Sequence, residues 1–581
     1  MLLFTVIVLV VALIYFLFLI YWAIIASTKT PSQLTSSNGL WFAVGLDQIP
    51  DAIAIGVVMG CILTIPQYSI FHALHLINTM LAIIIPCCVS PFGFFLGRVY
   101  AQTSMPNELL EHSGRFWPVS GRISPLTGRI GCELRNMAVS ESEGLNMEQS
   151  RERFANEVDV ALAQSARPFA IHNARKVDAR GVAEHYWLVS DGSAIIATGN
   201  RDDDFAAACA SVGLDADADS DSVSSVGSGD SMTGSAGFVT NAAGRMMTPG
   251  YVDIHAHGSW GSSFDDGVQG IRMARAGHMM HGTTRQVLSL ITNPLDVMCA
   301  NLQTVRGMMG ARPDILGAHL EGPFLALSRK GAHDPECLKD PVPEYVDRLL
   351  HAANGCLRQI TIAPELPHGI DAIRRFAAAG VVPAVGHCDA DYATACRGFD
   401  AGAGIMTHMF NAMNGLHHRE PGPIPAAVED PRVTVELIND GFHVQDPMVR
   451  LGFGFAPHRI AFVTDAMAAT DCPDGHYLLG ALDVNVIDGH ARLASNGAIA
   501  GSTLTLEKAV QRAVLELGFT PTDAVEAATL TPAKAFGFDR ANPVTKQPLG
   551  LLAPGYAADV LLLNPATWAV EHVWCDAHLL R

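Results

Sequence analysis

A short apolar run, a polar residue at its end and a helical stretch recur in that order through residues 247–535. Eight such units in this length predict a (β/α)8 TIM-like barrel, in which parallel strands alternate with outer helices. The expected strands are YVDIHAH, TTRQVLSL, DILGAHLE, QITIAPE, VVPAVGH, GIMTH, VTVELIND and RIAFVTD.

Strand-like segments flank this region on both sides. FAIHNARKVD and HYWLVSDGSAIIATG lie within residues 169–246, and LGLLAPGYAADVLLLNP lies within residues 536–581. We expect the two flanks to pair into one small β-sandwich domain. Residues 213–237 are acidic, rich in Ser and Gly and have almost nothing to bury, which predicts a disordered surface insertion.

The first hundred residues differ from the rest of the chain. Residues 1–27 carry no charge and are long enough to span a bilayer, and they lack the basic start and cleavage site of a signal peptide. A second uncharged stretch covers residues 52–97. These features predict an apolar extension over residues 1–104 with transmembrane helices and membrane anchoring through residues 1–97.

The extension would be followed by a linker or helical segment over residues 105–168 and by a cytoplasmic catalytic region. The alternative is that the apolar segment comes from an upstream start codon and is absent from the working protein. Met147 is then a suitable internal start. The sequence leaves both possibilities open.

Composition narrows the class of partner. The formal net charge is -19, with 57 acidic against 38 basic residues, which argues against a nucleic-acid partner. A small anionic substrate needs only a few local donors and stays compatible. Twelve cysteines form no CxxC pair, which favours reduced thiols in a cytosolic protein over a zinc ribbon or a disulfide framework.

Metal-binding side chains follow the predicted strands. The carboxyl ends of barrel strands converge on one pocket, so these side chains should meet there. The two histidines of HAH are two residues apart and point to the same face of a strand. Imidazoles with carboxylates suit Zn²⁺ or Fe²⁺ better than Mg²⁺ or Ca²⁺. The candidates are His255, His257, Glu321, His387, His408 and Asp465.

This set supports metal-assisted hydrolysis of an amide. A divalent cation lowers the pKa of a bound water and polarises a carbonyl oxygen. A carboxylate must then accept the water's proton and pass it to the leaving nitrogen. Asp465, at the end of the apolar run IAFVTD, is the natural candidate for this general base and acid.

Several motifs, taken together and in order, resemble the N-acetylglucosamine-6-phosphate deacetylase family of the amidohydrolase superfamily. The likeness covers the chain from about Phe169 to its C-terminus, apart from the acidic insertion. It implies hydrolysis of N-acetyl-D-glucosamine 6-phosphate to D-glucosamine 6-phosphate and acetate in amino-sugar catabolism. The motifs are TPGYVDIHAHG, HLEGPF, KGAH, VGHCDA, THMFNAMNGLHHREPG, INDGFHV, VTDAMAAT and GSTLTL.

The resemblance also implies a metal arrangement. Glu321, His387 and His408 would hold the principal divalent ion. Some members of the family have an HxH pair on the first strand and can bind a second ion. This chain has the pair, so His255 and His257, with Asp465 as a further ligand, would complete a second site. One or two ions per subunit are therefore expected.

The same matching implies a set of substrate-binding residues. His443 would contact the sugar and help to polarise the acetyl carbonyl, and His333 would reach the substrate from the loop after the third strand. Asn411 and Ala412 would donate to the phosphate. Arg419 resembles the family's phosphate-binding arginine, which comes from the neighbouring subunit and implies a homodimer.

Two other functions remain as alternatives. Dihydroorotase-like or hydantoinase-like amidohydrolases act on different amides and use a carboxylated lysine on strand four. QITIAPE has no lysine, and a glutamate on strand three can bridge two metals instead. A membrane-tethered, non-catalytic barrel would be expected to have lost Asp465 or a metal ligand, and none is missing.

Overall fold

The computed structural model describes residues 147–217 and 237–581. All of them belong to one of two compact units, Ile130–Arg581. The expected apolar extension over residues 1–104, its anchoring segment 1–97 and most of the acidic insertion lie outside the described residues. Within the described part, no helix combines the length and the apolar character that crossing a membrane requires.

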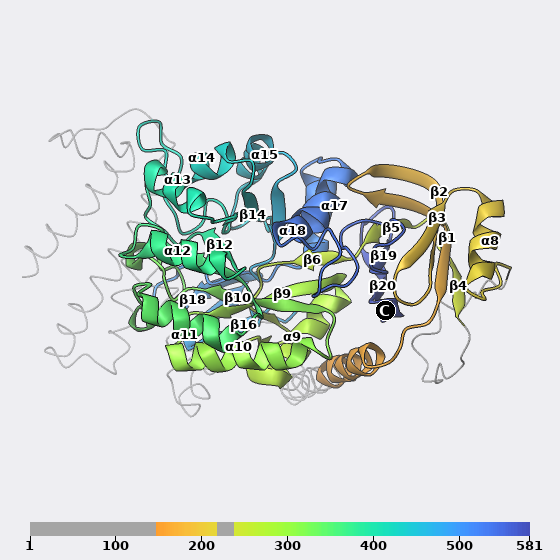
Figure 1. The fold of residues 1–581 in the computed structure, drawn as a ribbon, viewed down its shortest axis with the longest axis horizontal. Helices are drawn as coiled ribbons and strands as arrows, with labels where there is room; N and C mark the ends of the chain where they lie inside the picture. The colour runs from red at the N-terminus through yellow and green to blue at the C-terminus, as the bar shows by residue number, and fades with distance from the viewer. Residues whose placement is uncertain (1–146, 218–236) are drawn as a thin grey trace, which may run out of the picture. The chain divides into compact units, whose positions relative to one another are not determined.

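The centre of the described unit is an eight-stranded parallel barrel (Figure 1). Its strands coincide with the eight apolar runs, so the barrel prediction is confirmed. In order around the sheet they are β6 (Tyr251–Asp253), β9 (Thr283–Ile291), β10 (Ile315–Glu321), β11 (Leu357–Ile362), β12 (Val382–Val385), β13 (Ile405–Met406), β14 (Thr434–Ile438) and β15 (Ile460–Val463).

The barrel closes just beyond the ends of its first and last strands. The backbone N–H of Asp465 donates to the carbonyl of His255 at 2.8 Å, and the N–H of His257 donates to the carbonyl of Ala466 at 2.7 Å. The residues that follow β6 and β15 are therefore fixed against one another, and both segments carry candidate site residues.

Helices that connect successive barrel strands or follow the last one lie on the outside of the barrel (Figure 1). They are α9 (Gly267–Met280), α10 (Leu295–Met309), α11 (Pro343–Ala353), α12 (Gly369–Ala378), α13 (Tyr392–Asp400), α14 (Pro423–Glu429), α15 (Asp446–Phe455), α16 (Leu506–Gln511), the π-helical turn η4 (Arg512–Glu516), α17 (Pro521–Ala528) and α18 (Leu530–Ala535).

The sequence of α11 explains why such a segment forms a helix in this position. Pro343 occupies the first turn, where its missing N–H costs nothing, and Asn354 ends the helix in the left-handed conformation with φ 41°. Val346 and Leu349 are buried at helical spacing and pack in the barrel core.

A second sheet of eight strands is built from both flanks of the barrel, as expected. Figure 1 shows the gold strands from the N-terminal flank beside the blue strands from the C-terminal end. The strands are β1 (Phe169–Asp178), β2 (Gly181–Ser190), β3 (Ile195–Gly199), β4 (Phe238–Asn241), β5 (Met246–Pro249), β19 (Val560–Leu563), β20 (Val570–Cys575) and β21 (His578–Leu579).

The expected sandwich of two separate sheets is wrong, because hydrogen bonds join all these strands into one sheet. The sheet nevertheless encloses its own core, since the ring of Phe169 on β1 stacks on Trp574 of β20 with centroids 5.8 Å apart. Alternate residues of β1 and β2 face the other way. There Trp187 packs against Phe205 of α8 (Asp202–Ser211), at a centroid distance of 5.6 Å.

A buried ion pair joins the barrel to this sheet. Arg285 on β9 donates from Nε and Nη2 to the carboxylate of Asp559, at 2.6 and 3.0 Å. Asp559 immediately precedes β19, and its carbonyl accepts from the N–H of Gly250 at 3.0 Å. The two-pronged geometry fixes β19 relative to the start of the barrel.

A helix over residues 147–162 packs on the barrel, within the segment 105–168 that we expected to be linker or helix. Phe154 and Val158 belong to the barrel's buried apolar cluster. Asp159 pairs with Arg272 of α9 and accepts from Arg312 at 2.6 Å. The packed unit therefore extends further towards the N-terminus than the family resemblance.

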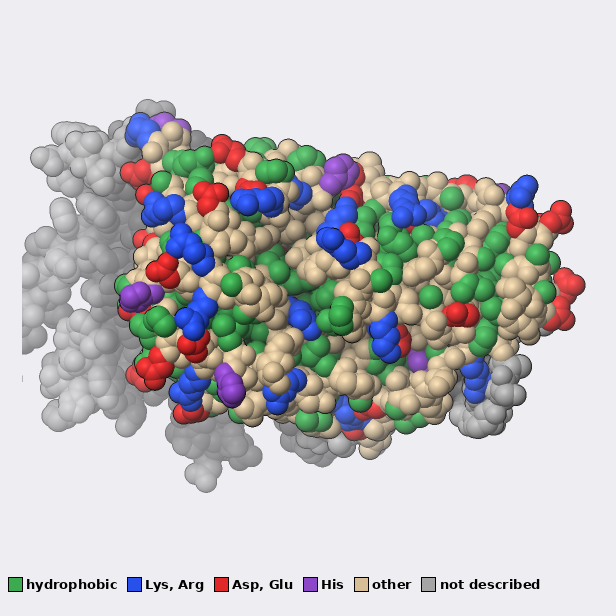
Figure 2. All heavy atoms as spheres, viewed as in Figure 1, with side chains coloured by type: hydrophobic (Ala, Val, Ile, Leu, Met, Phe, Trp, Pro, Cys, Tyr) green, Lys and Arg blue, Asp and Glu red, His purple; other side chains and the backbone are tan. Residues whose placement is uncertain are grey.

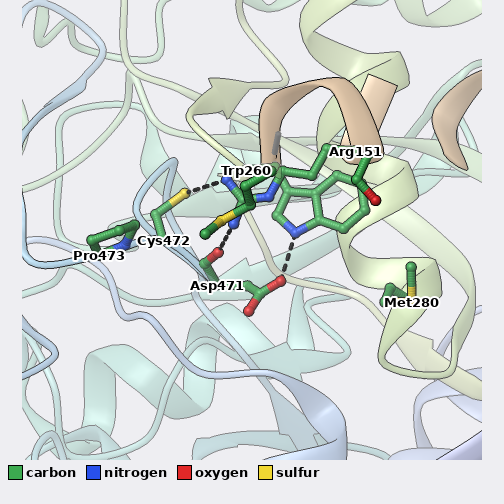
Figure 3. Close-up of a pocket in the computed structure, with 8 residues that line it drawn as sticks. Arg151, Trp260, Met280, Asp471, Cys472 and Pro473 are labelled. Carbon is green, nitrogen blue, oxygen red and sulfur yellow. Dashed lines mark hydrogen bonds between the residues drawn. The ribbon is translucent and has the colours of Figure 1, made fainter. Parts of the chain in front are cut away.

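A pocket of about 450 Å³ lies where this helix meets the loops after β6 and β15 (Figure 3). Nε1 of Trp260 donates to Asp471 at 2.7 Å, and the guanidinium of Arg151 lies 5.3 Å from the centroid of the Trp260 ring. Arg151 also donates to the carbonyl of Asp471. The helix thus supports two loops that carry candidate site residues.

Two small antiparallel additions lie on the barrel loops. One is a three-stranded sheet between β15 and α16, comprising β16 (Gly475–Leu479), β17 (Leu482–Ile487) and β18 (His490–Leu493). The other is the hairpin of β7 (Gly258–Ser259) and β8 (Ser262–Ser263). The strand pattern of the sequence did not lead us to expect either. Asp488-Gly489, a common hairpin turn, was the local signal for β17–β18.

Charges of both signs are interspersed on the face shown in Figure 2. Basic side chains on the barrel helices have acidic neighbours. On α12, for example, Nη1 of Arg374 lies 2.8 Å from Oδ1 of Asp371. The electrostatic potential over such a face is mixed, and no continuous stripe of charge of one sign runs along it.

Candidate metal centre

The barrel brings the six metal-competent side chains together at the carboxyl ends of its strands. His255 and His257 follow β6, Glu321 is the last residue of β10, and Asp465 follows β15. His387 and His408 come after β12 and β13. All six side chains are buried. Residues more than 200 positions apart in the sequence therefore share one pocket.

Glu321 lies at the centre of this cluster. Its two carboxylate oxygens face different groups of histidine nitrogens. Oε1 lies 3.2 Å from Nε2 of each of His255, His387 and His408. Oε2 lies 3.0 Å from Nε2 of His257. One carboxylate can thus serve two groups of ligands.

The donor atoms form two sets that share Glu321. One set is Glu321, His387 and His408, and the other is His255, His257, Glu321 and Asp465. Within each set the donor atoms lie within 4.8 Å of one another. Nitrogen and carboxylate donors at this spacing fit a transition-metal ion better than Mg²⁺ or Ca²⁺.

Unpartnered nitrogens support this fit. Nε2 of His255 is buried and has no hydrogen-bond partner, although it lies 3.2 Å from Oε1 of Glu321. A buried polar atom without a partner is costly, and a cation that accepts the lone pair of that nitrogen removes the cost.

The orientation of His387 is fixed from outside the cluster. Its Nδ1 lies 2.8 Å from the carbonyl of Arg329, which can only accept a hydrogen bond, so Nδ1 carries the proton. The lone pair is then on Nε2, which faces Glu321. Metal-binding histidines are commonly held in this way.

Backbone strain is concentrated at the same place. His387, His408 and Asp465 have φ angles of 46°, 26° and 49°. Residues other than glycine rarely adopt this left-handed region, and such strain is typical of functional sites held by their surroundings. Each of these residues lies directly after or close behind a barrel strand, where the chain turns sharply into the pocket.

Interactions within the cluster shift the pKa values of Asp465 and His257 in opposite directions. Burial raises the pKa of Asp465, but the hydrogen bond with His257 and the charge of His255 outweigh it and lower the pKa to about 2. Burial lowers the pKa of His257, but hydrogen bonds to Asp465 and Glu321 raise it to about 9. Asp465 is therefore an anion that can accept a proton.

His333 is more deeply buried than we expected for a loop residue that contacts the substrate. Its side chain is 3% exposed, and its Nε2 lies 3.3 Å from Oε2 of Glu321. Nδ1 is 2.9 Å from Oγ1 of Thr292. Burial lowers the pKa of His333 to about 4, which favours a neutral imidazole. The structure thus brings His333 into the cluster.

His443 lies close enough to the cluster to feel the charge of Asp465. Its Nδ1 bonds to Oδ2 of Asp440 at 2.7 Å. Burial lowers the pKa of His443, but the hydrogen bond and charge of Asp440 and the charge of Asp465 raise it overall. The carboxylate of Asp440 keeps the ring in place.

Asn411, Ala412 and Arg419 lie on the segment after His408. Asn411 and Ala412 are half-buried, and Ala412 has a φ of 49°. Arg419 is exposed, and its Nη1 lies 2.8 Å from Nε2 of His418. Within the single chain, the structure does not bring Arg419 into the buried cluster.

The sequence analysis did not identify the residues that support the cluster through hydrogen bonds. Glu436 on β14 accepts a hydrogen bond from Nδ1 of His255 at 3.0 Å, and Gln359 on β11 donates to Glu436 at 2.7 Å. Asp253 on β6 accepts from Oγ1 of Thr464 at 2.7 Å. A charged residue inside an apolar strand, as in VTVELIND, was the available signal, because a buried carboxylate needs donors.

Comparison with known proteins agrees with this geometry. Residues 246–578 match the Amidohydrolase family. An N-acetylgalactosamine-6-phosphate deacetylase of Escherichia coli O157:H7 is 35% identical over 59% of this chain and 89% of that protein. An N-acetylglucosamine-6-phosphate deacetylase of Vibrio furnissii is 33% identical over 58% of this chain and 82% of that protein.

A solved structure is similar over the whole of its length. It is an N-acetyl-D-glucosamine-6-phosphate deacetylase mutant from Mycobacterium smegmatis in complex with N-acetyl-D-glucosamine-6-phosphate. The TM-score is 0.60 at 33% identity, over 72% of this chain and 100% of the other. The family match covers the barrel strands and the strand-end cluster, so this chain is a hydrolytic enzyme of the metal-dependent amidohydrolase family.

Proposed function

We propose that the chain hydrolyses the N-acetyl group of N-acetyl-D-glucosamine 6-phosphate to give D-glucosamine 6-phosphate and acetate, as a step of amino-sugar catabolism. The observation that carries this proposal is the position of Asp465 beside the Glu321 cluster, with Oδ1 3.4 Å from Nε2 of His257. The names of the similar proteins from Vibrio furnissii and Mycobacterium smegmatis supply the substrate.

The metal part of the proposal is one or two Zn²⁺ or Fe²⁺ ions per subunit. Glu321, His387 and His408 would hold the principal ion, and His255, His257 and Asp465 would complete a second site. A bound divalent cation lowers the pKa of water towards neutrality and polarises a carbonyl oxygen.

The chain's own residues move the proton. The attacking water adds to the acetyl carbonyl and gives its proton to Asp465. Asp465 then protonates the amine nitrogen as the carbon–nitrogen bond breaks, which releases acetate and the amino sugar. His443, held by Asp440, donates to the acetyl oxygen, and His333 supports the substrate from the loop after β10.

Phosphate recognition is assigned to the segment after β13. Asn411 and the backbone of Ala412 donate to the phosphate, and Arg419 of the partner subunit adds a charged contact across a homodimer interface. One or two charge-assisted hydrogen bonds are enough to select a phosphorylated sugar. The exposed position of Arg419 supports this arrangement, because an exposed guanidinium is accessible to a neighbouring subunit.

A second candidate substrate is N-acetyl-D-galactosamine 6-phosphate, which differs at one hydroxyl. The E. coli relative bears that name at 35% identity. Both sugars place the acetamide and the phosphate at the same positions of the ring, so the same cluster can serve either.

The domain boundaries are also a proposal. We assign the barrel to residues 247–535 and the small sheet to residues 169–246 and 536–581. We further assign the helix 147–162 to the catalytic unit, since Phe154 and Val158 belong to the barrel core.

The test is acetate release by the purified full chain from both sugar phosphates, with bound metal measured in the same sample. Asp465→Asn should lose about 100-fold or more in turnover, the scale of a general acid–base residue. Asp471→Asn, six residues further on, serves as a control and should retain turnover. Near-normal turnover by Asp465→Asn would reject its role, and no acetate from either sugar phosphate would reject the function.

A further inference from the structure

Glu436 is a fully buried charged residue in the middle of a barrel strand. It lies in β14, between Val435 and Leu437, and its side chain is 0% exposed. A carboxylate in such a place is costly unless donors surround it. The proposed reaction gives it no part, so its retention in an otherwise apolar strand needs a reason.

Both of its oxygens have partners. Oε2 accepts from Nδ1 of His255 at 3.0 Å and from the backbone N–H of His408 at 3.2 Å. Oε1 accepts from Nε2 of Gln359 at 2.7 Å. Glu436 thus touches one candidate ligand from each of the two metal sets.

The contact with His255 determines the state of that ring. The N–H of His408 and the amide of Gln359 both donate to this carboxyl group, which therefore acts as an acceptor, so Nδ1 of His255 carries the proton. The lone pair is therefore on Nε2, which lies 3.2 Å from Glu321 and 3.6 Å from Asp465. With the opposite tautomer, Nε2 would present a hydrogen to the place where the second ion binds.

The contact with His408 acts on the backbone. His408 has a φ of 26°, a conformation that an ordinary residue holds only with outside support. Its N–H donates to the same oxygen that His255 contacts. This bond supports the turn after β13 but does not involve the ring nitrogens of His408.

We infer that Glu436 is a positioning residue that holds His255 with its Nε2 lone pair facing the second metal site, and so determines whether a second ion binds. The inference rests on the proposed function, because it assumes that His255, His257, Glu321 and Asp465 hold an ion. It predicts that occupancy of the second site depends on Glu436 more strongly than occupancy of the first.

The variant Glu436→Leu tests this. Leucine offers no acceptor, so Nδ1 of His255 loses the partner that fixes its proton. Affinity for the second equivalent of metal should fall by about 10- to 100-fold, the usual effect of losing a partner behind a ligand. Affinity for the first equivalent should change much less.

Gln359→Leu is the matched control. It removes the donor to the other oxygen of Glu436 and leaves the contact with His255. We expect this variant to unfold at a lower temperature but to bind both equivalents as the wild type does. If metal affinity fell only because the fold is less stable, it would fall in both variants.

The readouts are Zn²⁺ titration against a chelator and the visible spectrum of the Co²⁺-loaded chain as each equivalent is added. Wild-type affinity for both equivalents in Glu436→Leu, or equal loss of both, overturns the inference. A wild-type chain that binds only one ion overturns it too. Acetate release is measured separately, so the deacetylase proposal can stand or fall independently.

Discussion

Nε2 of His387 lies 3.0 Å from Nε2 of His408, with the two ring planes 74° apart. His387 donates from Nδ1 to a carbonyl, so its Nε2 presents a lone pair to the other ring. Both rings are buried, and Oε1 of Glu321 lies 3.2 Å from each of these nitrogens. Nitrogen lone pairs and a carboxylate that lie this close together in a buried site are stabilised when they bind one cation.

Replacing the shared carboxylate should therefore remove the metal altogether. We expect Glu321→Gln to retain under a tenth of the wild-type metal after dialysis and to lose acetate release by about 100-fold or more, because it takes a charged ligand from both sites. Metal analysis of the purified chain and the acetate assay check this result.

His319→Asn is the control for this variant. His319 stands beside the cluster, with its ring centroid 4.7 Å from that of His255, but its nitrogens bond to Ser289 and Thr361 at 2.8 and 2.9 Å. It should keep wild-type metal content. Normal metal in Glu321→Gln, or equal loss in both variants, contradicts a centre built on Glu321.

The sequence predicted the barrel and its polar strand ends for a physical reason. Strand periodicity and the residue that follows a strand are local features, and parallel strands then bring Glu321 and His408 to the same end without further information. The fold comparison and the observed strand order confirm that architecture. The roles of the individual residues stay predictions.

What the sequence did not predict depends on contacts between distant segments. Glu436 lies in a strand interior and has meaning only through His255, which is 181 positions away. His333 was predicted to reach the substrate from the loop after the third strand. Its burial depends on how that loop folds back over Thr292. The small sheet brings Phe169 and Trp574 into stacking contact. These residues are far apart in the sequence, so no local pattern predicts the contact.

Arg419 should distinguish phosphorylated from free sugar. Loss of one charge-assisted hydrogen bond costs about 1.5–3 kcal/mol, so Arg419→Ala should raise KM for the 6-phosphate by roughly 10- to 100-fold. Hydrolysis of free N-acetylglucosamine should change little. His417→Ala in the same exposed loop is the control and should leave both substrates unaffected. Equal losses on both substrates would show that Arg419 does not bind phosphate.

Mixing two impaired variants tests whether Arg419 acts across a subunit interface. In a dimer of one Arg419→Ala and one Asp465→Asn subunit, one site combines an intact Asp465 with the intact arginine of the partner. Activity on the 6-phosphate should therefore reappear after the subunits are exchanged. If Arg419 acts within its own chain, each site keeps a defect and the mixture is no more active than the separate variants.

The helix 147–162 should be part of the stable enzyme. The Phe154 ring lies 6.1 Å from that of Trp260 at an angle of 70° and is 8% exposed. Phe154→Ala should lower the free energy of unfolding by about 3 kcal/mol, at the low end for a buried ring because this one lies at a seam. Val160→Ala, on the exposed face of the helix, should change it by less than about 0.5 kcal/mol. Denaturant unfolding measures both, and equal small effects would mean that the helix does not pack on the barrel.

His281 should make stability depend on pH above neutrality. Nδ1 of His281 lies 2.5 Å from Glu507, and Nε2 lies 3.5 Å from Asp471. Burial lowers the pKa of His281, but these two carboxylates raise it to about 9. In the unfolded chain the pKa is near 6.5. The charged pair therefore stabilises the fold fully below pH 6.5, and this contribution is lost as the pH rises through about 9.

The variant His281→Gln isolates this contribution. A difference of this size in pKa corresponds to a stabilisation on the order of 2 kcal/mol, once partial exposure of the ring is taken into account. The wild type should be more stable than His281→Gln at pH 6, and the gap should narrow by that amount at pH 9.5. Thermal unfolding of both chains across this range measures the gap. Parallel curves would mean that His281 is neutral in the folded protein, because only a ring that loses its proton within this window can make the two chains converge.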